Sequence, residues 1–336
     1  MKWKYPLILL AFTASLWGCG STKEECATIP PVKASPELVR MESLETRIPA
    51  VHSRTDVVKL FTHQPILRDY IFSRPAYPND SAFVDTLFHR FSNPHFDTLL
   101  METQRVFGDG SALKDELATA FSNLHYYFPD YQLPRVQTAI TGMESDVFIT
   151  DSLVVIGLDY YLGEGARYRP VMYDYILRRY QRNFVVPSVM LLIGISGQLN
   201  KVDEQDHTAL ADMITYGKAY YFAKQMLPCT PDSVLLGYTS REMEGCKKFE
   251  GLIWYRLIED QVLYSNVHAI KQKFLGERPK TLEVGNECPG RIGMWVGWQI
   301  VSHYMKEHPE VSLSELMQTA SAQKIFKESR YKPKYD

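Results

Sequence analysis

The chain of 336 residues is 45% hydrophobic and 23% charged, which is the composition of a folded protein and not of a disordered one. Its 37 basic and 39 acidic residues give a formal net charge of −2, and no basic block stands out along the chain. We therefore do not expect nucleic acid as a partner. The 21 tyrosines suit either an aromatic core or a surface that binds proteins or glycans.

The first eighteen residues have the layout of an export signal. Two lysines precede an apolar run, Pro6–Leu16, which is too short to cross a bilayer as a helix. The run ends in Leu16-Trp17-Gly18-Cys19, where a small residue precedes the cysteine as in the sites that lipoprotein signal peptidase cleaves. We predict a lipoprotein signal peptide over residues 1–18 and attachment to a membrane through acyl chains such as palmitate on Cys19. The alternative is an ordinary secretory signal that contains a cysteine.

Residues 19–40 are predicted to form a flexible tether, because prolines and small or charged residues dominate them and cannot bury a core. The acid-containing run Lys23-Glu24-Glu25 resembles a signal for export to the cell surface in the Bacteroidetes, and a solvated linker is the simpler alternative. No later stretch has the roughly 18 apolar residues of a spanning helix. We expect a protein of the cell envelope, lipid-anchored at the outer membrane, whose domain over 41–336 faces the periplasm or the cell surface.

This domain is predicted to be α+β and mostly helical, with one small antiparallel sheet. Helical spacing of apolar residues runs through 37–124 and stops before Pro129. Three strand patterns follow, over Arg135–Ile140, Asp146–Thr150 and Ser152–Leu158. Because the connections are short and contain turn residues, we predict an antiparallel meander of these three strands.

The pattern is helical again after Pro170. Apolar periodicity predicts further helices over Val185–Gln198, Thr208–Met226, Lys247–Tyr264, Val267–Leu275 and Pro289–Lys306. A pattern typical of a capping box at Ser312 opens the last helix.

The predicted helix over Pro289–Lys306 carries three glycines on one side. Each glycine destabilises a helix by about 1 kcal/mol relative to alanine, so a compensating interaction is needed. Close approach of another helix backbone is one explanation. The other is that this helix is the wall of a cleft, facing a ligand or partner with Arg291, Trp295 and Gln299.

The motifs of common hydrolases are missing or broken. None of the nine histidines is spaced as HxxxH, which a helical zinc site needs to bring two imidazoles to one face, although a metal held by scattered ligands stays open. Gly194-Ile195-Ser196-Gly197 is an incomplete nucleophile elbow, and no glycine-rich phosphate loop is present. We therefore expect no metal, no cofactor and no catalytic residue.

Four cysteines remain besides Cys19, and an oxidising compartment would allow disulfides among them. Cys229 and Cys246 flank a loop that contains proline, aspartate and glycine, and they are our predicted local pair. Closing a loop of this size would contribute about 3 kcal/mol. Pairings with Cys26 or Cys288, or four free thiols, stay open.

Six blocks of distinctive sequence follow one another along the chain: Tyr127-Phe128-Pro129, Ile156-Gly157-Leu158-Asp159-Tyr160-Tyr161-Leu162-Gly163, Met213-Ile214-Thr215-Tyr216-Gly217-Lys218-Ala219-Tyr220-Tyr221, Gly237-Tyr238-Thr239, Pro289-Gly290-Arg291-Ile292-Gly293 through Trp298-Gln299-Ile300-Val301, and Ser329-Arg330-Tyr331-Lys332-Pro333-Lys334. In this order they resemble the gliding-motility lipoprotein family GldB of the Bacteroidetes, over essentially the whole mature chain. The resemblance implies a role in gliding motility or the associated type IX secretion machinery, with other envelope proteins as partners.

More distantly, the arrangement is similar to predicted zinc proteases with an HExxH motif and a second ligand-bearing helix. The counterpart of that second motif is Tyr216-Gly217-Lys218-Ala219, where tyrosine replaces the ligand glutamate, and the first motif is missing. This resemblance implies a zincin-like scaffold without its metal, which binds and does not cut. Alternatives are a zinc-dependent or other hydrolase, and a binder of cell-wall glycan. We expect the partner site at Tyr216, Lys218, Arg291, Trp295 and Gln299.

Overall fold

The computed structural model describes residues 32–335. The predicted signal peptide, Cys19 and most of the predicted tether lie outside these residues. The packed domain begins before residue 41, because the short helix η1 (Pro36–Leu38) contacts α4 and Val39 is buried. Within residues 32–335, no helix combines the length and apolar character that crossing a membrane requires.

Helices dominate the first part of the domain, as predicted from the periodicity of residues 37–124. The α-helices are α1 (Arg54–Phe61), α2 (Asp80–Phe91), α3 (Pro94–Phe107) and α4 (Ser111–Tyr127). Short 3-10 or π turns connect many elements: η2 (Glu45–Ala50), η3 (Leu67–Ile71), η4 (Arg74–Ala76), η5 (Leu158–Tyr161) and η6 (Arg182–Phe184).

The sheet has four strands and is mixed, so the predicted antiparallel meander is wrong in its topology. Its strands are β1 (Met41–Ser43), β2 (Arg135–Ala139), β3 (Val147–Ile149) and β4 (Leu153–Gly157), in the order β1-β2-β4-β3. The predicted hairpin of β3 and β4 is confirmed, but β4 pairs in parallel with β2, and β1 adds a parallel strand. The burial pattern gives the reason. All five residues of β4 are buried, as in a central strand, whereas the half-buried β3 suits an edge.

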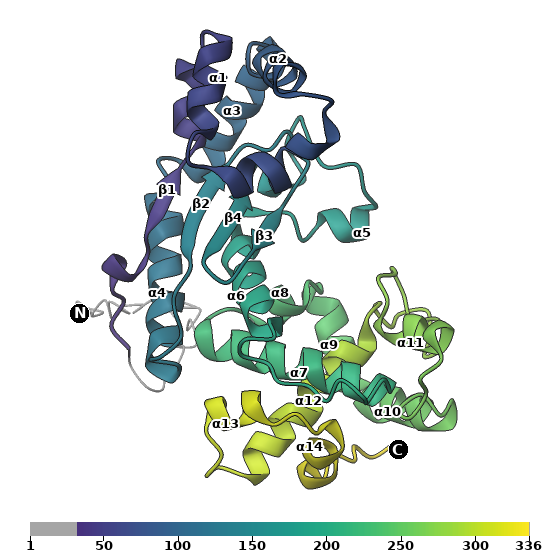
Figure 1. Ribbon diagram of the computed structural model, residues 1–336. Helices are drawn as coiled ribbons and strands as arrows, with labels where there is room; N and C mark the ends of the chain where they lie inside the picture. Colours follow the sequence, from purple (N-terminus) through teal and green to yellow (C-terminus); the bar gives the residue numbers. More distant parts are fainter. Residues whose placement is uncertain (1–31, 336) are drawn as a thin grey trace, which may run out of the picture.

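The second part of the domain is helical throughout (Figure 1). Its α-helices are α5 (Asp174–Leu177), α6 (Val185–Ile195), α7 (Ala209–Met226), α8 (Asp232–Leu236), α9 (Ser240–Lys248), α10 (Glu250–Glu259), α11 (His268–Leu275), α12 (Ile292–Glu307), α13 (Leu313–Gln318) and α14 (Ala322–Ser329). The helix predicted over 247–264 corresponds to α10, which ends at Glu259, and the sequence did not predict α9, which ends just before it at Lys248. The capping box at Ser312 is confirmed, but it opens α13, and α14 follows separately.

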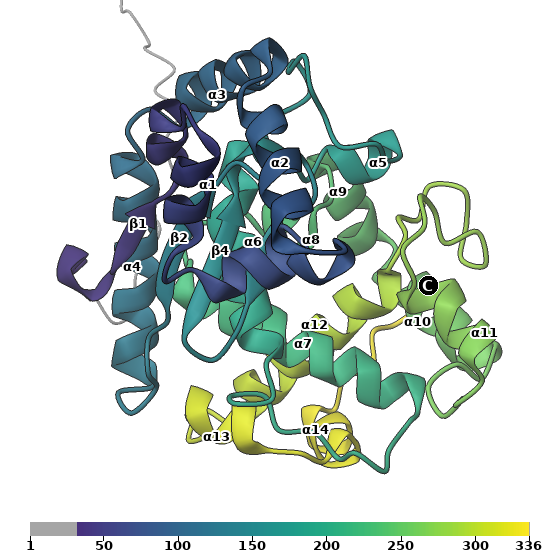
Figure 2. The same ribbon diagram turned by 45° about the horizontal axis from the view of Figure 1, so that its top comes forward.

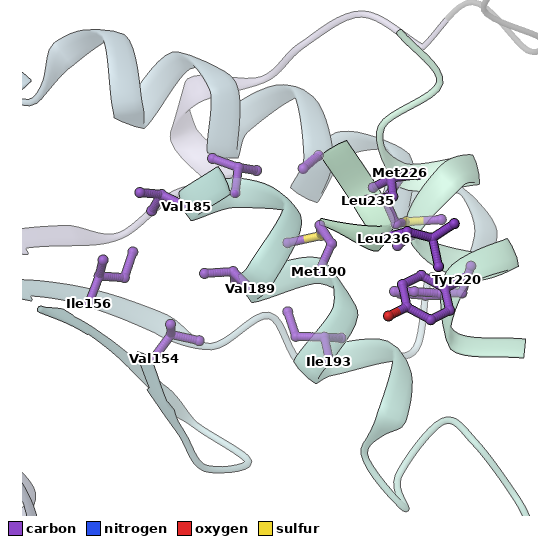
Figure 3. Close-up of a cluster of buried hydrophobic side chains, with 14 of the residues drawn as sticks. Val154, Ile156, Val185, Val189, Met190, Ile193, Tyr220, Met226, Leu235 and Leu236 are labelled. Atoms are coloured by element: carbon purple, nitrogen blue, oxygen red, sulfur yellow. The ribbon is translucent and has the colours of Figure 1, made fainter. Parts of the chain in front are cut away.

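Helix α6 joins the sheet to the helical part, because its apolar side chains face both. Figure 3 shows Val185, Val189, Met190 and Ile193 between Val154 and Ile156 of β4 on one side and side chains of α7 and α8 on the other. All of these residues are buried. Burying each such side chain contributes about 1.5–3 kcal/mol. Figures 1 and 2 both show α6 between the sheet and the group of α7 to α14.

Helices α7 and α12 cross with their backbones in close contact, and two glycines allow it. A Cβ atom on Gly297 would lie 1.8 Å from the carbonyl oxygen of Met213, and one on Gly217 would lie 2.3 Å from the carbonyl oxygen of Gly297. Distances this short leave room for hydrogen only. Of the two explanations for the glycines of the predicted helix, close approach of another helix is therefore confirmed for Gly297, whereas Gly290 lies before α12 and packs against the backbone of Arg278.

Candidate functional site

Lys218 is a structural residue inside the fold. Its side chain is 1% exposed, and Nζ donates to the carbonyl oxygens of Lys201 at 2.6 Å, Thr319 at 2.9 Å and Met317 at 3.4 Å. Burial lowers the pKa of this ammonium to about 8. The three carbonyls belong to the segment before α7, the last turn of α13 and the residue after it, so Lys218 ties these segments to α7.

The five residues predicted to form one partner cleft do not all line the same cavity. Trp295 is 1% exposed, while Tyr216 on α7 and Gln299 on α12 are half-buried. Lys218 and Arg291 line different cavities. Trp295 and Lys218 are each only 1% exposed, which leaves almost no surface for a partner, so the structure contradicts the cleft prediction at these two positions.

Arg291 precedes α12 and holds two segments in place. Its backbone adopts the left-handed conformation, with a φ of 60°, and its Nη2 donates to the carbonyl oxygen of Leu236 at 2.7 Å. Its Nε lies 3.6 Å from Oε2 of Glu277, and Nη2 of Arg179 donates to the same oxygen at 2.7 Å. Two guanidinium groups therefore share one carboxylate between the end of α5, the end of α8 and the loop after α11.

A second set of ion pairs adjoins the first, since Arg178 and Arg179 are neighbours in the chain. Nη2 of Arg178 lies 2.9 Å from Glu242, and Nζ of Lys280 lies 3.7 Å from the same carboxylate. Glu242 also accepts the N–H of Thr239 in the capping box of α9. Burial opposes ionisation of Glu242, but these hydrogen bonds and charges outweigh it and hold its pKa below the usual value. The charge network thus fixes α9 against α5 and the loop after α11.

Beside this network lies a cavity of about 720 Å³, which we call the α9 groove. It lies between α9, the start of α10 and the loop 280–289. Its apolar and sulfur-bearing lining consists of Cys246, Phe249, Leu252, Ile253, Val284 and Cys288. Its charged lining residues have both signs: Arg241, Lys248 and Lys280 with Glu242, Glu244 and Glu287. An apolar floor with a charged margin is the layout of a binding site.

The comparisons with known proteins decide the family. The family model GldB_lipo, described as gliding motility protein GldB, matches residues 25–333. The chain belongs to the GldB family. The predicted resemblance is confirmed, and membership implies a role in gliding motility and a lipoprotein of the cell envelope. No curated protein and no solved structure matches the chain.

The predicted disulfide of this GldB-family chain is wrong. Cys229 is disulfide-bonded, but Cys246 is a buried free thiol, and Cys288 is free as well. Cys246 lies on α9 with its side chain in the α9 groove, where Cys288 also lies. Chain proximity suggested the wrong partner because it ignores which way a helix directs its side chains.

Both thiols of the α9 groove are expected to react slowly in the native protein. Burial raises the pKa of Cys288 to about 12 and raises that of Cys246 as well. At pH 8 we expect alkylation of Cys288 to be roughly fiftyfold or more slower than that of free cysteine. A higher pKa leaves far less of the thiol ionised, and this loss outweighs the greater nucleophilicity of the more basic thiolate. The rate should rise with pH, and denaturation should remove the protection. Mass-spectrometric mapping of alkylation measures this, and rapid native labelling at pH 8 would contradict the burial of the thiols.

Sequence reasoning missed most of the groove and its charge network. Thr239-x-x-Glu242 is a capping-box pattern, and it could have placed the start of α9 at Ser240. Arg178 and Arg179 belong to a visible basic stretch, but nothing nearby in the sequence indicates their carboxylate partners. Within residues 32–335, no group of three or more histidine, cysteine, aspartate or glutamate side chains is arranged to hold a metal ion.

Proposed function

We propose that this protein is a non-catalytic, lipid-anchored component of the outer membrane that supports gliding motility and the type IX secretion machinery by binding another envelope protein. The gliding role follows from the family. The binding role is supported by one observation, which is that the α9 groove combines an apolar floor, charges of both signs and a rigid frame of ion pairs.

The lining of the α9 groove suits recognition of a peptide segment. Phe249, Leu252 and Ile253 offer apolar contacts to side chains of a partner, and the charged margin offers polar contacts to its backbone. The raised pKa of both thiols keeps them protonated, and a protonated thiol is a poor nucleophile. The groove therefore favours binding over covalent chemistry.

A bulky residue at Gly245 is expected to block this binding. Gly245 lines the groove, and a Cβ atom there would meet open space, so larger side chains extend into the cavity without disturbing the fold. We expect affinity capture of the lipidated Gly245→Trp variant to lose most of the envelope proteins that the wild type retains. In a gliding host, the same variant should fail to restore colony spreading to a deletion strain.

Gly245→Ala is the matched control and should behave as the wild type in both assays, because alanine leaves the cavity open. Equal recovery of partners by the tryptophan variant and the wild type would refute the groove as the partner site. The anchor has a separate test. Cys19 lies outside the described residues, and failure of palmitate labelling, or retention of Cys19→Ser at the envelope, would refute lipid attachment.

The non-catalytic, zincin-like part of the proposal is tested by elemental analysis of the purified protein. Tyr216 stands on α7 at the position that corresponds, in the resemblance to HExxH zinc proteases, to a ligand glutamate, and its side chain is half-buried. Stoichiometric zinc together with peptidase activity would overturn this part and leave the gliding role intact.

A further inference from the structure

The last described residues form a concentrated basic segment. Between Lys324 and Tyr335 there are five basic residues and one acidic residue, in a chain whose overall charge is close to neutral. The segment consists of α14 and the extended tail that follows it. In Figure 1 it lies in the lower part of the molecule, whereas α1 lies at the top.

The fold directs these basic side chains outward. Lys324 and Lys327 lie on the exposed side of α14. In the tail, exposed and buried positions alternate: Arg330, Lys332 and Lys334 are exposed, whereas Tyr331 is buried. One side of the extended chain thus faces the protein and the other presents cations.

The tail is fixed to α10 by contacts that leave its cations free. The hydroxyl of Tyr331 donates to Glu250 at 2.8 Å. A Cβ atom on Gly251 would lie 1.8 Å from the carbonyl oxygen of Lys334, so the tail backbone packs directly on α10. Among the described residues, the segment's one ion pair joins Arg330 to Glu307 at 3.4 Å, and its arginine is highly exposed. The four lysines are therefore held in place without neutralising partners.

Exposed apolar and aromatic side chains lie next to this charge. Tyr335 is 57% exposed and stacks on Tyr255 of α10, with ring centroids 5.0 Å apart. Ile258, one helical turn after Tyr255, is also exposed. We define the tail face as the five basic residues of the segment together with these three side chains: Lys324, Lys327, Arg330, Lys332, Lys334, Tyr255, Ile258 and Tyr335.

We propose that the tail face binds anionic lipid headgroups and orients the domain on the membrane that holds the protein. Lysines attract phosphate groups as point charges and need no fixed geometry, which suits a fluid headgroup layer. Tyrosines and exposed aliphatic side chains insert at the boundary between headgroups and acyl chains. The tail face is a different surface from the α9 groove, so lipid binding by the tail face does not depend on partner binding in the groove.

A membrane fits the tail face better than an acidic protein does. Four of the five cations are lysines on an extended or helical surface, and none of the four forms an ion pair within the described chain. Specific recognition of carboxylates in a protein interface favours arginines held in forked geometry. Because the family consists of lipoproteins, the anchor keeps the domain next to a membrane, and lipid headgroups are therefore the binding partner at the highest local concentration.

The test uses the full-length lipidated protein, reconstituted on vesicles of phosphatidylcholine alone or with about one third phosphatidylglycerol. Acetylation of lysine amines, read by mass spectrometry, measures which side chains the membrane covers. We expect labelling of Lys324, Lys327, Lys332 and Lys334 to fall about fivefold or more on the anionic vesicles. High salt should remove the difference, because it screens exposed charges. Lys59 on α1 should label equally on both vesicles.

A charge-neutral variant sharpens the test. Lys332→Gln with Lys334→Gln should restore labelling of Lys324 and Lys327 on anionic vesicles, and Lys59→Gln should leave their protection unchanged. Equal labelling of the tail lysines on both vesicles, or equal protection of Lys59, would overturn the proposal. Co-flotation with both vesicle types reports the lipid anchor separately, so failure of the anchor and failure of the tail face are distinguishable.

Discussion

Replacing Gly297 by alanine is expected to lower the free energy of unfolding by about 3 kcal/mol or more. The new Cβ atom would lie 1.8 Å from the carbonyl oxygen of Met213, and that oxygen belongs to the backbone of α7. No side-chain rotation can relieve this contact, so the two helices must separate along a crossing that is buried on both sides. Urea denaturation followed by circular dichroism measures the effect.

Gly245→Ala is the control for the Gly297 substitution. Both glycines lie within α-helices, but a Cβ atom at Gly245 meets open space. The control variant should be as stable as the wild type or more stable by up to about 1 kcal/mol, because alanine favours a helix. Equal stability of the two variants would show that the crossing of α7 and α12 is looser than described here.

Replacing Trp295 by alanine is expected to lower the free energy of unfolding by about 3–5 kcal/mol. Trp295 is one of the largest side chains with almost no solvent exposure, so truncation would remove its buried surface and leave a cavity. Thermal and urea unfolding both measure this loss. A tryptophan that lined an open cleft would give a much smaller change.

Gln299→Ala provides the matched control for the Trp295 substitution, because Gln299 lies one turn later on the same helix and is half-buried. We expect this variant to stay within about 1 kcal/mol of the wild type. If both substitutions lowered the free energy of unfolding by the same small amount, the assignment of Trp295 to the core would be refuted. The interpretation of α12 as the wall of a cleft would then be favoured.

The substitutions of Gly297 and Trp295 test the packing of α7 against α12, which we call the frame. We expect function to reside elsewhere in the helical part of the domain. Helix α7 packs against α12 and is tied through Lys218 to the end of α13. Both the α9 groove and the tail face include residues of α10: Leu252 and Ile253 line the groove, and Tyr255 and Ile258 belong to the tail face. A stable frame therefore holds two surfaces that the proposals assign to a protein partner and to a membrane.

The cysteines and the sheet show where local reasoning fails. The turn residues between Cys229 and Cys246 predict a local disulfide, but α9 directs the Cys246 side chain into the groove beside Cys288. The short connections predict β3 as the sole partner of β4, whereas β4 also pairs in parallel with β2. Both errors have one cause, which is that spacing along a chain does not determine which surfaces face each other.

The sequence by itself determined the elements that local chemistry controls. Apolar periodicity located α6, α7 and α11 to within a few residues, the capping box located the start of α13, and the order of distinctive blocks identified the family. Only the tertiary structure decided that Trp295 and Lys218 are internal, that two glycines meet at a helix crossing, and that the charges of α5, α9 and the loop after α11 frame one groove. The physical reason is that burial and ion pairing depend on contacts between residues far apart in the chain, and these contacts leave no periodic signal in the sequence.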